Sequence, residues 1–473
     1  MNENIVRADE LVAGELKEAR KSKKLVYVVA FTAALAGLLF GLDIGVISGA
    51  LPFIAKQFQA TTLAQEFVVS SLLVGAVIGT LLSGLISRRW GRKDALLVSA
   101  VIFALGSVLS SVAPNADILM AVRLFLGVAV GMASFTAPLY LAEMAPQRIR
   151  GGLISMYQLM ITIGILAAYL SDTFLSYGGH WRVMLGILVI PSVLMFVGIY
   201  LLPKSPRWLV LAGRKKSARA VLEKLRHADE VEAELEAIEE TIETKQGGFQ
   251  LFLSNKQFRK VIFLGIALQA IQQFTGMNVV MYYAPKIFNL AGFTSAVEAM
   301  WGTVLVGLIN VLATFIAIAL VDKIGRKPIL FAGFCVMGLS MGTLGLMFHF
   351  GMQTSHTLQF IGIAALLMFI VGFAMSAGPI IWVICSEIYP LSGRDFGITI
   401  STATNWVCNA IIGATFLTLL QVAGPAHTFW LYGGLNVVFI IVLFIFVPET
   451  KGVSLEKIED NLMSGKRLVR IGR

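Results

Sequence analysis

Apolar residues along this chain gather into twelve long stretches that are separated by short polar segments. Each stretch has about 20 residues or more, the length that an α-helix needs to cross the hydrocarbon core of a membrane. The predicted spans are residues 25–51, 66–87, 94–113, 118–142, 153–175, 182–202, 260–285, 297–320, 327–349, 359–385, 396–420 and 428–447. The pattern therefore predicts an all-α membrane protein with twelve transmembrane helices.

A long polar stretch, residues 203–258, interrupts the series of spans after the sixth. Within it, apolar residues recur at steps of three or four among Glu, Lys and Arg, namely Leu222, Leu225, Leu235, Ile238 and Ile242. This spacing is typical of amphipathic helices that lie at an interface. We therefore expect short helices that link two groups of six spans.

Short motifs repeat between the two groups of spans, at offsets of 234, 244 and 245 residues. The pairs are Gly91-Arg92-Lys93 with Gly325-Arg326-Lys327, Glu143, Pro146 and Arg150 with Glu387, Pro390 and Arg394, and, less closely, Pro203-Lys204-Ser205 with Pro448-Glu449-Thr450. The offsets indicate a duplicated half of about 240 residues. Two parallel halves that meet at a central seam are typical of alternating-access transporters.

The duplication predicts two pseudo-symmetric six-helix domains. We expect an N-terminal tail at 1–24, the first domain at 25–202, a helical linker at 203–258, the second domain at 259–447 and a C-terminal tail at 448–473.

Composition and charge agree with this picture. Hydrophobic residues make up 57% of the chain and charged residues 14%, whereas soluble domains have about 45–50% and about 25%. The net charge is +10, and its basic clusters fall on one side of the predicted spans, at residues 20–24, 88–93, 148–150, 204–226, 323–327 and 466–473. By the positive-inside rule, that side and both termini are expected to be cytoplasmic. This placement argues against a nucleic-acid partner.

Sequence patterns for catalysis, metals or cofactors are missing. The three cysteines, Cys335, Cys385 and Cys408, lie in apolar spans without metal-ligand spacing, so we expect buried packing residues. The polar residues inside the spans contain no nucleophile–base pair, and no phosphate-cradling glycine loop occurs. We therefore expect a protein that is not an enzyme and that needs no cofactor or metal.

Two charged residues lie inside apolar spans. A charge at mid-membrane costs about 2.5–3.5 kcal/mol on insertion scales, so such residues are candidates for function. Asp43 is about nine residues, and Arg123 about six, from the outer ends of their spans, so at 1.5 Å per residue their depths differ by about 5 Å. We expect these two side chains to be able to meet.

The pair admits two interpretations. It can be a structural ion pair that holds two helices together, or it can be a proton site. Low dielectric favours the neutral acid and a nearby Arg favours the carboxylate, so Asp43 should take up a proton when Arg123 moves away. Sodium would need several oxygen ligands around an unwound helix, and residues 39–48 offer few. Protons are therefore the favoured ion.

Uncharged polar and indole side chains mark a candidate ligand site. They are Gln158, Gln272, Gln273, Asn278, Asn310, Trp382, Asn405 and Trp406. Amides both donate and accept hydrogen bonds, as vicinal hydroxyls require, and indole offers a flat apolar face. Gly276 allows a helix break that would turn Gln273 and Asn278 into one cavity. Each amide taken alone could equally join two helices, but the group favours a neutral polyhydroxyl ligand.

Several motifs together resemble the sugar porter family of the major facilitator superfamily, and the resemblance covers nearly the whole chain. They are Gly41-Leu42-Asp43 with Val46-Ile47-Ser48-Gly49, Arg89-Trp90-Gly91-Arg92-Lys93, Pro203-Lys204-Ser205-Pro206-Arg207-Trp208-Leu209, Gln272-Gln273-Phe274-Thr275-Gly276-Met277-Asn278 and Pro448-Glu449-Thr450-Lys451-Gly452. The stretches Met375 to Glu387 and Arg394-Asp395-Phe396-Gly397 are similar to galactose-transporting bacterial members of the family, with arabinose-transporting members next.

The resemblance implies a role for individual residues. Sugar would be bound by Gln158, Gln272, Gln273, Asn278, Asn310, Trp382 and Asn405, in a cavity lined by Phe40, Tyr282, Gly378 and Trp406. Asp43 would couple protons, with Arg123 as its partner. A cytoplasmic gate would be formed by Arg92, Glu143, Arg150, Asp322, Arg326, Glu387 and Arg394. Lys204 departs from the family, where many members have Glu, which puts any gating contact there in doubt.

The expected function is proton-coupled symport of a neutral monosaccharide, galactose or a related hexose, or arabinose, across the bacterial inner membrane. The expected partners are the sugar, the proton and the lipid bilayer, and the protein is expected to work as a monomer. A facilitative sugar uniporter is one alternative. A non-transporting sugar sensor is the other, and the short tails of about 24 and 26 residues argue against it.

Overall fold

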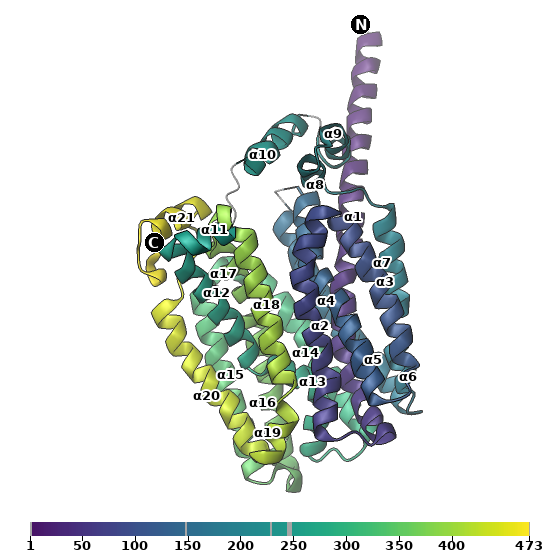
Figure 1. Cartoon of the computed structure of the whole chain (residues 1–473), viewed down its shortest axis with the longest axis vertical. Helices are drawn as coiled ribbons and strands as arrows, with labels where there is room; N and C mark the ends of the chain where they lie inside the picture. The colour runs from purple at the N-terminus through teal and green to yellow at the C-terminus, as the bar shows by residue number, and fades with distance from the viewer. Residues whose placement is uncertain (1, 147–148, 228, 244–247, 473) are drawn as a thin grey trace.

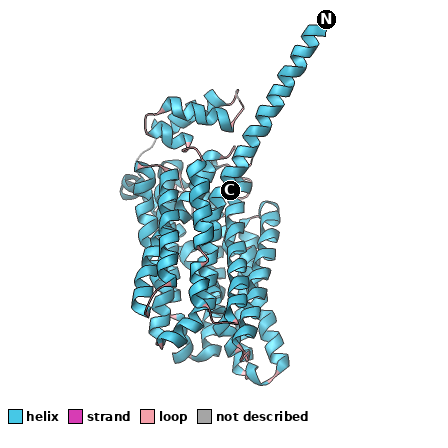
Figure 2. Cartoon of the chain, turned by 90° about the vertical axis from the view of Figure 1, so that its right-hand side faces the viewer, coloured by secondary structure: helices cyan, strands magenta, loops and turns pink. Residues whose placement is uncertain are grey.

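The computed structural model describes residues 2–146, 149–227, 229–243 and 248–472. Side chains are described within these ranges except at residues 2–24, 150, 151, 154, 241–243, 320–322 and 391. Throughout the described ranges the regular secondary structure is helical, without a strand. The helices stand side by side in a bundle, and short helices lie across one end of it (Figures 1 and 2).

The first half of the chain forms one set of long helices, drawn in purple and blue in Figure 1. Its helices are α1 (Asn2–Phe58), α2 (Thr62–Arg89), α3 (Arg92–Ser111), α4 (Ala116–Met144), α5 (Arg150–Ser176), α6 (Trp181–Gly186) and α7 (Val189–Leu201). The last two together make the sixth predicted span, which crosses as Trp181–Leu201.

The second half forms the other set, drawn in teal, green and yellow (Figure 1). Its helices are α12 (Lys256–Phe274), α13 (Met277–Leu290), α14 (Ala296–Ile324), α15 (Arg326–His349), α16 (His356–Met375), α17 (Ala377–Ile388), α18 (Arg394–Gly413), α19 (Phe416–Val422) and α20 (Gly424–Phe446). Short 3-10 turns at Met352–Thr354, Leu391–Gly393 and Leu468–Arg470, and a final helix α21 (Leu455–Met463), complete this half.

Eleven stretches in the described part of the chain are long and apolar enough to cross a membrane. The seventh predicted span, 260–285, is the remaining one, and it is divided into α12 and α13 at Gly276. Gly276 has φ +94°, in the left-handed region, and a Cβ there would come within 2.9 Å of the Tyr432 ring. A side chain would be strained at this position, so glycine permits the break.

The polar linker folds as predicted into short helices, α8 (Pro206–Leu211), α9 (Lys215–Leu225), α10 (Val231–Glu243) and α11 (Gly248–Ser254). Leu222, Leu235 and Ile238 bury their side chains together in a small cluster with Trp208, while Ile242 lies outside the described side chains. Arg226 donates to the carbonyl oxygens of Met144 and Ala145 at 3.0 and 3.1 Å. The linker is therefore anchored to the end of α4.

The linker helices, α21 and both chain ends lie at the same end of the bundle, which we call the linker side (Figure 1). The other end, where α1 ends and α2 begins, is called the opposite side. The two halves diverge toward the linker side (Figure 1).

Glycines bring α1 close to α5. A Cβ at Gly41 would lie 2.0 Å from the Ile161 carbonyl oxygen, and one at Gly49 would lie 2.2 Å from Asp172. Small residues at four-residue spacing let helix backbones approach in this way in a bilayer. The close approach fixes the depth and the direction of the α1 side chains, Asp43 among them.

Glu449 stabilises the start of α15. Its carboxylate accepts hydrogen bonds from the backbone N–H groups of Arg326, Lys327 and Lys451 at 3.1, 2.9 and 2.9 Å. Partial burial by itself would raise the pKa of Glu449, but these N–H groups outweigh it and hold the pKa below its ordinary value. The equivalent position in the first half is Lys204, which pairs with Asp94 at 2.7 Å. The two halves thus use different charges at the same corner.

We expect Glu449→Gln to lower the free energy of unfolding by about 1 kcal/mol, the usual value of a helix cap. A lowered native pKa stabilises the fold above the unfolded-state pKa, and this contribution is lost as the pH falls through the native pKa. Thermal melting in detergent should therefore show a wild-type advantage at neutral pH that shrinks in acid. Glu236→Gln, at an exposed site on α10, is the control, and an equal effect of both substitutions would contradict the capping role.

Candidate functional site

The two charged residues predicted to meet form a buried ion pair. The Nη1 and Nη2 atoms of Arg123 on α4 donate to Oδ1 and Oδ2 of Asp43 on α1, each at 3.3 Å. Arg123 is 1% exposed and Asp43 is 3% exposed. The Nε of Arg123 also donates to the Val68 carbonyl oxygen of α2 at 2.8 Å. A buried pair needs such bidentate geometry and extra hydrogen bonds to offset the loss of hydration.

An amide cluster lies in the second half, between α12, α17 and α18. Nε2 of Gln272 donates to the carbonyl oxygens of Ala377 and Gly378 at 2.8 and 2.9 Å. Nδ2 of Asn405 donates at 2.7 Å both to Gln272 and to Gln269. The sequence analysis did not identify Gln269 as a candidate site residue, although it lies three residues before Gln272 and therefore on the same helix face.

The helix break at Gly276 brings together the two amides that flank it. Nδ2 of Asn278 donates to Oε1 of Gln273 at 2.5 Å. Gln273 is buried and Asn278 is half-buried. The break therefore brings the two amides into direct contact, while the cavity that we expect them to face stays a prediction.

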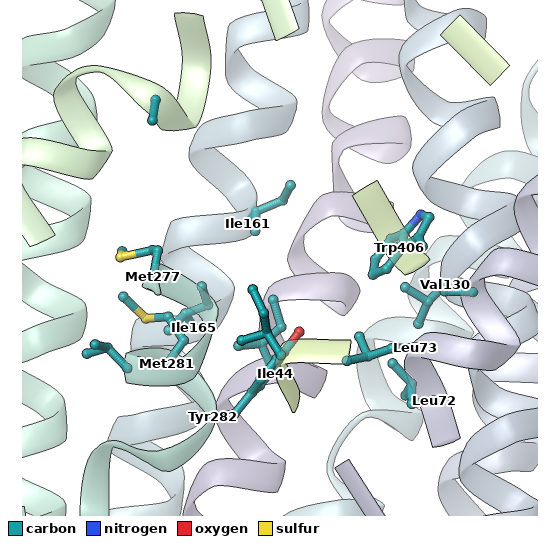
Figure 3. Packing of buried hydrophobic residues seen from close by; sticks show 14 of the residues in the cluster. Ile44, Leu72, Leu73, Val130, Ile161, Ile165, Met277, Met281, Tyr282 and Trp406 are labelled. Carbon is teal, nitrogen blue, oxygen red and sulfur yellow. The ribbon is translucent and has the colours of Figure 1, made fainter. Parts of the chain in front are cut away.

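Aromatic residues from both halves meet between them. Phe40 of α1 packs edge-to-face on Trp406 of α18, with ring centroids 5.2 Å apart. Tyr282 of α13 accepts a hydrogen bond from Asn409 at 3.1 Å. Figure 3 shows Tyr282 and Trp406 in the same hydrophobic cluster as Ile44 of the first half. The region between the halves is thus apolar, with amides along one side.

Three other residues predicted to bind the ligand do not take part in the hydrogen bonds of the amide cluster. Gln158 on α5 and Trp382 on α17 are half-buried, and Asn310 on α14 is buried. Within the described residues, the structure does not join their side chains to the amide cluster by a direct hydrogen bond. Their polar atoms therefore remain candidates for contact with a ligand.

The charged motifs on the linker side form the same arrangement in both halves. In the first half Arg92 donates to Oε1 of Glu143 at 2.8 Å, and Ser205 donates to Oε2 at 2.5 Å. The second half repeats this, with Arg326 on Glu387 at 2.9 Å and Thr450 on the other oxygen at 2.6 Å. Each pair is internal to its half, so it does not tie the halves together.

The expected gate has three other residues, Arg150, Asp322 and Arg394. Arg394 donates to the carbonyl oxygen of Tyr389 at 3.3 Å, also within its own half. The side chains of Arg150 and Asp322 lie outside the described residues.

Contacts between the halves gather on the opposite side. Oε1 and Oε2 of the fully buried Glu66 on α2 accept from the N–H and the hydroxyl of Thr418 on α19, both at 2.7 Å. The hydroxyl of Tyr169 on α5 donates to the Met281 carbonyl oxygen of α13 at 2.7 Å. We call these two contacts the outer latch. The sequence analysis did not single out Glu66, because this residue is the first of a predicted span. A charged residue at the end of a span is ordinarily exposed to water.

The site holds no metal cluster in the part of the chain that the structure describes, and the three cysteines are free. Its chemistry is that of neutral hydrogen-bonding groups and aromatic rings beside one buried ion pair. Such groups can bind and orient a neutral polar molecule, and the ion pair can exchange a proton if it separates.

Known proteins similar to this chain are membrane transporters. A galactose-proton symporter of Escherichia coli (strain K12) is 59% identical over 457 residues, which cover 96% of this chain and 98% of the relative. An arabinose-proton symporter of the same strain is 52% identical over 459 residues, 96% of this chain and 97% of the relative.

Solved structures agree with this similarity. The xylose transporter XylE from E. coli, in a partially occluded inward open conformation, matches with a TM-score of 0.81 and 31% identity over 91% of this chain and 100% of that chain. Residues 29–462 match the family described as sugar (and other) transporter. With that match over most of its length and relatives more than half identical to it, this chain belongs to the sugar (and other) transporter family.

Proposed function

We propose that this protein is a proton-coupled symporter that carries a neutral monosaccharide across the membrane by alternating access. The substrate is galactose or a related hexose, with arabinose as the second candidate. The observation that carries the proposal is the buried Asp43–Arg123 pair within the first half of a chain whose relatives are sugar–proton symporters. The absence of such an acid would instead have favoured a facilitative uniporter.

The coupling follows from the cost of burying charge. While Arg123 contacts Asp43, the carboxylate is balanced and can stay ionised in low dielectric. When the halves rearrange, α1 and α4 shift against each other inside the first half and the guanidinium moves away. The neutral acid is then favoured, so Asp43 takes up a proton. A membrane potential of about 100 mV then contributes about 2.3 kcal/mol for each charge moved. This free energy can sustain a sugar concentration inside the cell that is some tens of times the concentration outside.

The amide cluster supports a sugar as the ligand. Gln272, Gln273, Asn278 and Asn405 bond to one another or to carbonyl oxygens, and sugar hydroxyls can take over those bonds. The indoles of Trp382 and Trp406 offer flat faces for the apolar side of a sugar ring. None of these residues is charged, which disfavours an amino acid or a phosphate ester.

The proposed orientation has the linker side and both termini in the cytoplasm of a bacterial cell, with the protein in the inner membrane. The basic clusters of the sequence support this orientation. The proposed domains are residues 25–202 and 259–447, joined by the cytoplasmic linker at 203–258, and the protein works as a monomer. In this orientation the outer latch closes the external side, so the structure corresponds to an inward-facing state.

The charged motifs then form the inner gate. In the inward-facing state Arg92 and Arg326 satisfy the glutamates of their own halves. When the inner side closes, the ends of α4, α5, α17 and α18 approach, and Arg150, Asp322 and Arg394 can join a network across the halves. The matching arrangement in both halves supports this role over that of solvated surface charge, which contributes only about 0–1 kcal/mol per pair.

Addition of sugar to a cell suspension should make the external medium alkaline, tested across galactose, glucose, arabinose and xylose. Asp43→Asn should abolish this alkalinisation and uphill accumulation, and leave sugar counterflow partly intact, because counterflow needs no net proton movement. Asp117→Asn, at an exposed site on α4, should transport as the wild type does. Accumulation by Asp43→Asn at the wild-type level would contradict proton coupling.

Asn405→Ala should weaken sugar binding by about 5- to 150-fold, because hydroxyl partners are left unpaired at about 1–3 kcal/mol. Titration of tryptophan fluorescence with each of the four sugars measures the affinity directly. Asn289→Ala, on an exposed part of α13, serves as the control. An unchanged affinity for every sugar would remove Asn405 from the ligand site.

Glu66→Ala should open the external side more often, because it removes two hydrogen bonds that join the halves. We expect an increase of about 5- to 30-fold in the outward-facing population, for about 1–2 kcal/mol lost. Val69 is buried, and a Cβ on Gly413 of the other half would lie 3.5 Å from it. The labelling rate of Val69→Cys by a membrane-impermeant thiol reagent, with the native cysteines replaced, reports the opening.

Glu66→Gln retains one acceptor oxygen and should give a smaller increase than Glu66→Ala. Labelling at the parent rate in both variants would show that the Glu66 contact does not hold the external side closed.

A further inference from the structure

A second acid lies deep in the first half, and the coupling mechanism above does not use it. Asp172 is on α5 and is fully buried. It faces Gly49 of α1, where a Cβ would come within 2.2 Å of its Oδ2 atom. Gly49 is six residues beyond Asp43, which places Asp172 about 9 Å nearer the opposite side along α1.

The carboxyl group of Asp172 has no partner among the described residues. Neither Oδ1 nor Oδ2 accepts or donates a hydrogen bond, and the nearby Ser48 hydroxyl is also buried and unbonded. Asp43, by contrast, has both oxygens on Arg123. An ionised carboxylate without hydrogen bonds or a counter-charge is far more costly to bury than a neutral acid.

The surroundings of α5 supply no available counter-charge. The helices packed against it are α1, α4, α6 and α14, and their charged residues nearer the opposite side are Asp43, Lys56, Asp117, Arg123, Arg182 and Glu298. Arg123 is engaged with Asp43, and Arg182 donates to Gln57 and to the Ala113 carbonyl oxygen. Lys56, Asp117 and Glu298 are exposed. The titratable neighbour on α5 itself, Tyr169, donates to the Met281 carbonyl oxygen.

We propose that Asp172 is a second proton-binding site, which holds a proton while the outer latch is closed and exchanges it with the external medium when the latch opens. Tyr169, one turn away on α5, forms part of that latch. When α5 separates from α13 and α14, water reaches this part of the helix, the carboxyl O–H bond breaks and the proton passes to water. The ionised acid cannot be buried again without its proton, so the external side stays open until Asp172 is reprotonated.

This inference rests on the proposed function and extends it. Asp43 couples the proton to sugar movement, whereas Asp172 makes closure of the external side depend on external protons. Alkaline medium outside is therefore expected to hold the protein outward-facing and to slow every mode of transport, including exchange of sugar without net proton flow.

Infrared spectroscopy of the purified protein in lipid tests protonation independently of sugar transport. Wild type at neutral pH without sugar should show the C=O stretch of a protonated carboxylic acid, and the Asp172→Asn spectrum should lack that component. Asp43→Asn should retain it. Aspartate labelled with ¹³C should shift the band in wild type and not in Asp172→Glu, which keeps the assignment possible if the Asn variant is poorly expressed. An unchanged band in Asp172→Asn would overturn the proposal.

Sugar counterflow in proteoliposomes, measured from mildly acidic to alkaline external pH, tests the consequence. Wild-type exchange should fall as external pH rises, and Asp172→Asn should retain severalfold more exchange at the alkaline end. Asp117→Asn, which makes the same change at an exposed site on α4, should keep the wild-type profile. Identical pH profiles of wild type and Asp172→Asn would show that Asp172 is only structural. Failure of the proposed symport would instead appear as missing sugar-induced alkalinisation, with the infrared result unaffected.

Discussion

The cost of placing charge in a low-dielectric interior governs this protein. Asp43 and Arg123 can be buried only because each oxygen of the carboxylate meets a guanidinium nitrogen and Arg123 also reaches the Val68 carbonyl. Separation of the pair would leave a charge that the surroundings cannot solvate. In the proposed mechanism, a shift of α1 against α4 is therefore coupled to the gain or loss of a proton.

Contacts within each half differ in kind from contacts between the halves. Within the first half, glycines on α1 and α5 let the backbones touch, and ion pairs join the helix ends on the linker side in both halves. Between the halves, the polar contacts of the outer latch are hydrogen bonds of Glu66 and Tyr169. We propose that each half moves largely as a unit while the latch opens and closes, with a local shift between α1 and α4 that separates Asp43 from Arg123.

Duplication explains both the symmetry and its exceptions. On the linker side, each half uses an arginine, a glutamate and a hydroxyl group in the same arrangement, because each half must satisfy the polar groups at its own helix ends. At the neighbouring corner Glu449 caps α15 in the second half, whereas Lys204 pairs with Asp94 of α3 in the first. The unusual Lys204 is thus matched by an acid on the facing helix, and the corner keeps a charge-assisted contact in both halves.

The sequence by itself determined the spans, the linker helices, the repeated motifs and the two charges that belong together. Moving a long apolar stretch into lipid, or a charged residue inside such a stretch, changes the free energy by a large amount. Such positions can therefore be recognised from the order of residues alone. It also located the break at Gly276, since glycine tolerates a left-handed backbone. Only the tertiary structure decided which polar groups are partners. Gln269 joined Asn405, Glu66 reached Thr418 across the halves, and Asp172 was left without a bond, because such pairings depend on distances between helices that are far apart in the chain.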